Sequence, residues 1–509
     1  MAQPEYIIGI DIGTTSTKVI LFANDGALVN RQTMHYPLRS PHPDIKEQDP
    51  KEIYRAVIQG VCKITTEQPA EIKNLIGLSF STAMHSIMAV DDQGELLTNS
   101  ITWADRRAAP WADKLRQHCD GHALYRRTGV PIHPMSPLTK IMWLREDQPE
   151  LFQKAAKFIS IKEYILYRWF GEYVVDYSIA NTSGLFNLNT FDWDGAALTF
   201  AGIDASRLSQ LVPTTHILKS MDAEAASCMG IPVDLPVVMG ASDGALANLG
   251  VGAIAPNTVT VTVGTSGAVR AMLCEPKTDP KERLFCYTLT EDYWVVGGAT
   301  NNGGIILRWA KDTLASSAVN TAELLQQDPY DILTAIAATI PPGSARLIFH
   351  PYLAGERSPL WDANARGSFF GLELNHTKAH MIRAVLEGVV YNLNAILTAL
   401  EETVGPATSI QATGGFARSD LWRQMLADVF NQPVTIPEVY EGSCFGAAVL
   451  GLYALERIPN LEQVSSMIKV SQIHKPIPEN VERYQIIIPL YQQLLDSLLP
   501  FYQKLKEIP

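Results

Sequence analysis

Two copies of one β-rich pattern, half the chain apart, constrain the fold more than any other feature. Residues 7–22 read IIGIDIGTTSTKVILF, and residues 258–273 read TVTVTVGTSGAVRAML. In each copy an apolar and threonine-rich run meets a Gly-Thr turn and resumes as a second such run, which is typical of a β-hairpin. Such a turn presents backbone N–H groups and hydroxyls, which suit a phosphate. The repeat therefore predicts a duplicated domain with a phosphate-binding loop in each half.

The length and composition exclude several classes of protein. A chain of 509 residues exceeds what one core usually serves, so we expect two or three domains. A net charge of −12 without basic runs argues against nucleic acid as a partner. Six cysteines without a C-x-x-C pair favour a reducing compartment. With no signal peptide and no apolar run of about 18 residues, we expect a cytoplasmic protein that binds no membrane.

Strands and helices mix along both halves, which predicts an α/β fold. Strands are expected at 6–12, 17–22, 75–80, 86–90, 235–239, 258–263, 268–273 and 293–297. Helices are expected at 51–66, 107–119, 161–170, 243–249, 377–403, 419–430 and 443–456. Glycine and proline at 250–256 indicate a boundary, so the predicted domains are 1–250 and 251–509.

The first Gly-Thr loop combines an acid, several hydroxyls and a lysine. Gly13 lets the backbone approach a phosphate closely, and Asp11 at the end of a strand could hold Mg²⁺ directly or through water. The candidate phosphate ligands are Thr14, Thr15, Ser16 and Lys18. An ordinary hairpin with a threonine-rich turn explains the same residues, so this motif alone does not decide the function.

The second loop has the same turn at Gly264-Thr265, but Thr262 stands where Asp11 stands in the first. Both halves can therefore bind phosphate, whereas only the first can position a cation through that carboxylate. A third segment, residues 413–419 (TGGFARS), joins a β-like run to a helix, and its two glycines suit close contact with a nucleoside or a phosphate. A plain strand-to-helix turn is the alternative. The pattern G-x-x-x-x-G-K-[S/T] is absent, which excludes a P-loop.

Asp243 is the candidate general base. It follows an apolar strand and is flanked by small residues, in the sequence MGASDG. From the carboxyl end of a strand it could accept a proton from a hydroxyl that attacks a phosphoryl group. The alternative is that Asp243 only caps the helix expected at 243–249.

Together these segments resemble the FGGY family of carbohydrate kinases, within the actin/hexokinase/heat-shock ATPase superfamily. DIGTTSTK is similar to the first phosphate loop of the family, VGTSG to the second and TGGFARS to the adenosine loop, and residues 351–372 and 383–393 resemble further family motifs. The resemblance runs from Ile7 to about Glu456. It implies two actin-like (ribonuclease H-like) domains, each a mixed sheet with flanking helices, around a central cleft. It also implies phosphorylation of a sugar with ATP and Mg²⁺.

The resemblance assigns roles to individual residues. Asp243 matches the catalytic base, and Asp11 with Asp243 matches the acids around Mg²⁺. The nucleotide contacts that it implies are Thr14, Thr15, Ser16, Lys18, Gly264, Thr265, Gly304, Gly414, Gly415 and Ser419. Ser419 stands where some members carry Asn.

The expected sugar contacts lie in the N-terminal half. Met84-His85 resembles a segment of xylulose kinases, and Trp103-Ala104-Asp105-Arg106 resembles the polyol-contacting segment of the family. With the proline-rich loop 129–137 that precedes Lys140, they are most similar to the gluconate kinases of the family. Gluconate carries a carboxylate, which Arg106, His133 or Lys140 could neutralise. A buried structural histidine at 85, and a solvated charge pair at 105 and 106, are the alternatives.

Three functions are therefore open. The leading one is ATP-dependent phosphorylation of D-gluconate, followed by a xylulose kinase. A non-catalytic actin-like sensor of sugar or nucleotide is the third, but a sensor does not need Asp11, Lys18 and Asp243 together. A homodimer is compatible with the sequence, which gives no indication of the oligomeric state.

Overall fold

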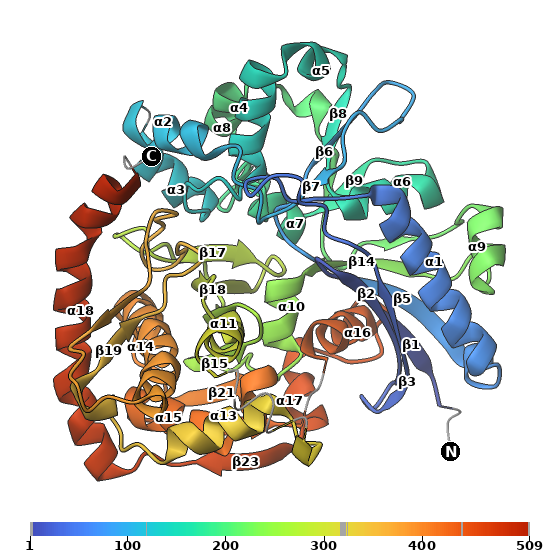
Figure 1. Cartoon of the computed structure of the whole chain (residues 1–509). Coiled ribbons are helices and arrows are strands. Elements are labelled where there is room, and N and C mark those ends of the chain that lie inside the picture. The colour runs from blue at the N-terminus through green and yellow to red at the C-terminus, as the bar shows by residue number, and fades with distance from the viewer. Residues whose placement is uncertain (1–3, 119, 316–321, 323, 439–440, 507–509) are drawn as a thin grey trace.

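The computed structural model describes residues 4–118, 120–315, 322, 324–438 and 441–506, and it contains two large mixed sheets. The N-terminal sheet has the strand order β13-β14-β5-β1-β2-β3 (Figure 1). Its strands are β1 (Tyr6–Ile12), β2 (Ser16–Ala23), β3 (Leu28–His35), β5 (Leu75–Thr82), β13 (Ile217–Leu218) and β14 (Val237–Ser242). Helices α1 (Pro50–Glu67) and α9 (Ala223–Met229) cover its outer face.

The C-terminal sheet has the order β17-β18-β16-β15-β21-β22-β23. Its strands are β15 (Thr258–Val263), β16 (Gly267–Leu273), β17 (Phe285–Thr288), β18 (Trp294–Thr300), β21 (Ser409–Thr413), β22 (Val434–Pro437) and β23 (Val470–His474). The helices packed around it are α11 (Gly304–Leu314), α13 (Pro329–Ala338), α14 (Lys378–Val404), α15 (Asp420–Phe430) and, outermost, α18 (Pro478–Lys506). The small pair β19 (Ile348–His350) and β20 (Ser368–Phe370) lies beside α14.

The two sheets repeat one topology, as the duplicated hairpin predicts. In the N-terminal sheet β1 is antiparallel to β2 and parallel to β5. In the C-terminal sheet β15 is antiparallel to β16 and parallel to β21. Each Gly-Thr turn therefore joins the two antiparallel strands at the same corner of its sheet. The α/β fold with two actin-like domains is confirmed.

Two helices lie between the sheets: α10 (Asp243–Leu249), which follows β14 directly, and α16 (Gly442–Ala454). Helix α16 packs on β1, β5 and α10, so a segment from the C-terminal half covers the inner face of the N-terminal sheet. The buried side chains at this contact include Ile7, Ile20, Leu246, Leu249, Cys444 and Phe445. The division into domains at residues 250 and 251 stays a prediction, and α16 crosses back over that line.

Residues 88–212 between β5 and β13 form a group of shorter elements at the top of Figure 1. Its helices are α2 (Ala109–His118), α3 (Gly121–Thr128), α4 (Pro137–Asp147), α5 (Pro149–Lys154), α6 (Ile161–Phe170), α7 (Tyr177–Thr182) and α8 (Gly195–Ala201). Its strands are β6 (Met88–Val90), β7 (Ser100–Ile101), β8 (Lys157–Ile159), β9 (Val174–Asp176), β10 (Phe186–Asn187), β11 (Asp192–Trp193) and β12 (Gln210–Val212). Two further short elements elsewhere are β4 (Glu47–Gln48) and α17 (Val464–Met467).

Most of the predicted elements are present, with shifted ends. The strand expected at 86–90 is only β6, because His85 adopts a φ of 64° and turns the chain before it. The strand expected at 235–239 runs on to Ser242, immediately before Asp243. Residue 119, where the helix expected at 107–119 would end, lies outside the described residues. Among the described helices, none has the length and apolar character needed to span a bilayer.

Candidate active site

A central pocket lies between the two Gly-Thr loops. It is lined by Thr14, Met84, His85, Trp103, Asp243, Thr262, Ser266, Gly267, Ala268, Arg270, Phe285, Ala299 and Arg357. The first five of these come from the N-terminal half and the others from the C-terminal half. A molecule bound here would therefore touch both halves of the chain.

Asp243 reaches this pocket as the first residue of α10. Ser242 is the N-cap of the helix, so Asp243 is not the capping residue, and its Oδ1 accepts a hydrogen bond from the Gly244 N–H at 2.8 Å. Burial and the nearby Asp11 carboxylate raise the pKa of Asp243 to about 6. A carboxylate with this pKa is largely ionised at pH 7 and can still accept a proton efficiently, which suits a general base.

Asp11 lies near the end of β1, two residues before Gly13 of the first Gly-Thr turn. Its Oδ1 accepts a hydrogen bond from Ser81 Oγ at 2.7 Å, and burial raises its pKa. In the C-terminal sheet the hydroxyls of Thr262 and Thr413 meet at 3.3 Å in the equivalent register. The carboxylate is thus present in only one of two matching corners.

The first Gly-Thr turn is closed by a hydrogen bond from the Gly13 N–H to the Ser16 carbonyl at 3.0 Å. Thr14 Oγ1 accepts from the Trp103 indole N–H at 3.0 Å, which fixes both side chains at the rim of the central pocket. Thr15 at the tip is exposed, and Ser16 is half-buried at the start of β2. These hydroxyls lie where a phosphate bound at the turn could be contacted.

Lys18 points to the α16 side of β2. Its ammonium forms an ion pair with Glu441 at 2.7 Å, and Arg31 contacts the same carboxylate at 3.2 Å. Although burial disfavours its charged form, the ion pair raises the pKa of Lys18. Lys18 is therefore fully charged, and a phosphate would have to compete with Glu441 for it.

A second pocket, the C-terminal pocket, has a volume of about 350 Å³ and brings together most of the nucleotide contacts predicted in the C-terminal half. Five predicted residues line it, namely Gly264, Thr265, Gly304, Gly415 and Ser419, together with Tyr330, Phe416 and Trp422. The sixth predicted residue of this half, Gly414, lines the adjoining hollow and has a φ of 104° that only glycine adopts readily. Backbone N–H groups beside aromatic rings suit a nucleotide.

The predicted sugar residues Met84 and His85 line the central pocket. His85 Nδ1 lies 2.6 Å from the Thr182 carbonyl, so this nitrogen carries the proton and Nε2 faces the Tyr287 hydroxyl at 3.3 Å. Burial, with Lys140 nearby, lowers the pKa of His85 to about 3. The imidazole is therefore neutral, and Nε2 is a hydrogen-bond acceptor.

Asp105 and Arg106 do not line this pocket. Asp105 is buried, and its carboxylate accepts from Arg107 Nε at 3.0 Å and from the Lys46 backbone N–H at 2.9 Å. Arg106 pairs with Asp44 at 2.8 Å, and its side chain is 44% exposed. It lines a separate pocket, the outer hollow, whose lining also includes His133, Trp361 and Arg366. The alternative of a solvated pair between Asp105 and Arg106 is not present either, because each residue has a different partner.

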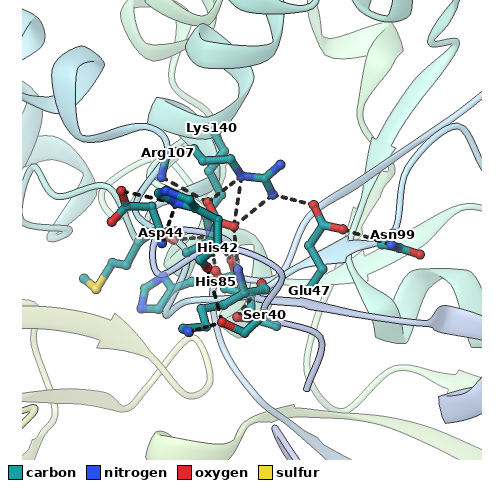
Figure 2. Close-up of polar contacts among 12 residues, drawn as sticks. Ser40, His42, Asp44, Glu47, His85, Asn99, Arg107 and Lys140 are labelled. Atoms are coloured by element: carbon teal, nitrogen blue, oxygen red, sulfur yellow. Dashed lines mark hydrogen bonds and ion pairs between the residues drawn. The ribbon is translucent and has the colours of Figure 1, made fainter. Parts of the chain in front are cut away.

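Lys140 does not line this pocket either. Its fully buried ammonium donates to the carbonyls of His85, Thr102 and Met135 at 2.7–2.8 Å (Figure 2). Burial lowers the pKa of Lys140 to about 7. Three carbonyls already use its three N–H donors, so we no longer propose Lys140 as a carboxylate ligand.

His133 lies on the outer hollow rather than on the central pocket. Its Nδ1 accepts from the Met135 N–H at 3.2 Å, and its ring packs edge-on against Trp361 at 5.6 Å. Burial lowers its pKa well below the usual value, so the ring is neutral. A neutral imidazole provides no charge to balance a carboxylate.

Two arginines that the sequence reasoning did not single out line the central pocket. Arg270 comes from the middle of β16, and Arg357 from the segment after β19. Arg357 donates to the Thr300 carbonyl at 3.2 Å and lies over the Trp103 ring at 4.9 Å. The sequence signal that could have identified Arg270 is its position as a single charged residue within the apolar strand GAVRAML.

Two actin-like domains with the buried Asp243 carboxylate in a pocket between two Gly-Thr loops are typical of one class of protein, the nucleotide-dependent phosphotransferases of this fold. The sequence places the chain within that class: residues 6–250 match the N-terminal domain of the FGGY family of carbohydrate kinases, and residues 259–455 match its C-terminal domain. The chain belongs to the FGGY family of carbohydrate kinases and is a sugar kinase.

Three relatives are similar to this chain over nearly its whole length. A gluconokinase from Bacillus subtilis is 51% identical over 490 residues, which covers 96% of this chain and 95% of that protein. The crystal structure of a gluconate kinase from Lactobacillus acidophilus matches with a TM-score of 0.93 at 37% identity, over 99% of this chain and 100% of the other. A ligand-bound xylulose kinase structure from the same organism also matches with a TM-score of 0.93 at 37% identity, over 98% of this chain and 100% of the other.

Proposed function

We propose that this chain is a gluconokinase, which transfers the γ-phosphoryl group of ATP to the terminal hydroxyl of D-gluconate and forms 6-phospho-D-gluconate and ADP. The observation that carries the proposal is the position of Asp243 in the central pocket between the two Gly-Thr loops. The sugar is assigned from the gluconokinase that is 51% identical over nearly the full length of both chains.

The chemical step follows from the protonation state of Asp243. Its carboxylate accepts the proton of the sugar hydroxyl while that oxygen attacks the γ-phosphorus. A new P–O bond forms to the sugar, and the bond between the γ-phosphorus and the bridging oxygen breaks, so ADP leaves with that electron pair. The loops at Gly13-Thr14 and Gly264-Thr265 supply N–H groups and hydroxyls for the phosphates from opposite sides.

Mg²⁺ would be held by Asp11 and Asp243 together with phosphate oxygens of the nucleotide. Within the described part of the chain there is no cluster of three or more His, Cys, Asp or Glu side chains that could hold a metal by itself. Two carboxylates fit Mg²⁺ nonetheless, because this ion usually takes one or two carboxylates and completes its shell with phosphates and water. When bound, it neutralises charge on the transferred group.

A xylulose kinase is the second candidate, because the Lactobacillus acidophilus structure of that title fits the fold equally well. A non-catalytic sensor is disfavoured because Asp11, Lys18 and Asp243 are present together, and a sensor does not need a general base. We place the enzyme in the cytoplasm because it needs ATP and because Cys62, Cys228, Cys274, Cys286 and Cys444 are free thiols.

An ADP-release assay with gluconate, xylulose, glycerol and ribulose tests the proposal. We expect the highest kcat/KM with gluconate. Higher turnover of xylulose would make the chain a xylulose kinase, and no sugar-dependent ADP release with any of the four would favour the sensor.

A further inference from the structure

Arg270 places an unpartnered guanidinium in the central pocket. Its Nε and Nη1 atoms are buried and have no hydrogen-bond partner among the described residues. A buried cation without a partner costs folding free energy, so such a group is retained where a ligand completes it. Arg270 lines the pocket, so the missing partner would be a bound molecule.

Arg357 lines the same pocket, and hydrogen bonds to its neighbour Glu356 fix its backbone. Its backbone N–H donates to Glu356 at 2.7 Å, and the Glu356 carboxylate is anchored by Thr300 at 2.6 Å and Asn392 at 2.7 Å. The Nε of Arg357 is buried and also lacks a hydrogen-bond partner among the described residues. Two guanidinium groups with donors to spare thus border one small volume.

The position of Arg270 along β16 separates it from the transferred phosphate. It stands three residues after Gly267, where the second Gly-Thr turn ends, which is about 10 Å at the rise of a strand. It also lies beside α10, since a methyl group added at Gly244 would be 3.7 Å from Arg270 Nε. A carboxylate bound at the Arg270 guanidinium would therefore lie beside the first turn of α10, and the rest of an extended six-carbon acid would occupy the same central pocket.

We propose that Arg270, with Arg357 beside it, binds the carboxylate of the substrate and makes the enzyme selective for a sugar acid over a neutral sugar. This inference rests on the proposed gluconate kinase activity and names the residues that recognise gluconate. It replaces Arg106, His133 and Lys140, whose side chains lie outside the central pocket. Planar N–H groups of arginine match the two oxygens of a carboxylate.

The electrostatics of the pocket agree with this geometry. Burial lowers the pKa of Arg270 to about 10; the Asp243 carboxylate opposes this decrease, and the Arg357 charge adds to it. Arg270 therefore remains charged at pH 7. An added carboxylate would relieve the repulsion between the two cations.

The variant Arg270→Met tests the proposal with two substrates of nearly equal shape, D-gluconate and the neutral D-gluconamide. We expect kcat/KM for gluconate to fall at least about 30-fold, because truncating one partner of a buried charged contact costs about 2–5 kcal/mol. For gluconamide we expect a decrease smaller than about threefold. The matched control is Arg366→Gln, which removes one positive charge from the outer hollow and should leave both values unchanged.

Equal losses for gluconate and gluconamide in Arg270→Met would overturn the proposal, because Arg270 would then act on Asp243 or on phosphate. Arg270→Lys keeps the charge without the planar pair of donors, so we expect an intermediate loss, and this variant also serves if Arg270→Met does not fold. Calorimetric titration of the wild type with gluconate distinguishes a failure of the proposed gluconokinase activity from a failure of the proposed role of Arg270. Xylulose turnover without gluconate binding would refute both, whereas gluconate turnover with unselective loss in the variant refutes only the role of Arg270.

Discussion

At the scale of single residues, the proposed role of Asp243 as a base comes with a cost to stability. The same burial that raises its pKa to about 6 also makes the ionised form less stable in the folded chain than in the unfolded one. Because the folded pKa lies above the unfolded value, the folded state gains stability as the pH falls toward 4. At pH 7 the carboxylate therefore destabilises the fold, which is expected of a group kept for chemistry.

Asp243→Asn tests this trade-off. We expect kcat to fall about 10²–10⁴-fold, because the amide cannot accept the proton. Binding of ATP, measured by calorimetry without sugar and without Mg²⁺, should change little, and Tm at pH 7 should stay equal or rise because a buried charge is removed. Retention of kcat would show that Asp243 has no role in proton transfer.

The pH profile of the wild type gives a second test at this scale. Since Asp243 acts as a base only when ionised, log kcat/KM should fall by one for each pH unit below about 6 and level off above it. The residual activity of Asp243→Asn provides the control, because it should lack this acidic limb. A profile that stays flat from pH 7 down to pH 5 would argue against Asp243 as the titrating group.

At the scale of elements, the contact between α10 and α16 determines how the two halves meet. A Cβ at Gly446 would overlap the Leu246 carbonyl, and one at Gly250 would overlap the Gly442 carbonyl. Glycine is thus required within α16 and directly after α10 for the close approach of the two helices. Because α10 begins with Asp243, this contact also sets the position of the base.

Gly446→Ala should therefore destabilise the fold by about 1–3 kcal/mol or more, as expected for overpacking. Gly195→Ala is the matched control, since Gly195 lies at the start of α8 with no atom near the added methyl. Thermal unfolding of both variants checks the prediction. Equal Tm values would mean that the two helices separate without cost.

How well the sequence predicts the protein also differs between elements. The strands around both Gly-Thr turns, and Asp243 at the end of β14, were predictable because alternation, apolar runs and turn residues are local signals. The contacts of Lys140 were not predictable, because two of its three carbonyl partners, those of His85 and Thr102, come from distant segments that only the fold brings together. Arg270 was missed for the same reason: its lack of a partner is a property of the folded pocket and not of the sequence.

At the scale of the whole molecule, the two halves meet at a second contact beyond the central pocket. Tyr125 in α3 donates to the Leu284 carbonyl at 2.7 Å, and the Cys286 N–H donates to the Gly129 carbonyl at 2.8 Å. Phe285, which lies between Leu284 and Cys286, lines the central pocket, so this contact adjoins the proposed sugar site. Ligands that bind residues of both halves would stabilise a closed arrangement that excludes water.

Small-angle X-ray scattering tests this expectation. The radius of gyration should decrease when gluconate and a non-hydrolysable ATP analogue are added together. It should decrease less with either one alone, because each then contacts fewer residues of the opposite half. An unchanged radius with both ligands would show that the halves do not move on binding.

The central claim is that the enzyme transfers the γ-phosphoryl group of ATP to the terminal hydroxyl of gluconate. The most direct measurement is ³¹P NMR of the product formed from gluconate and ATP by the wild-type enzyme. We predict one new phosphomonoester, formed in an amount equal to that of ADP. Its phosphorus should couple to the two protons of a terminal CH₂ group. A phosphate coupled to a single CH proton, or ADP formed without any phosphomonoester, would contradict the claim.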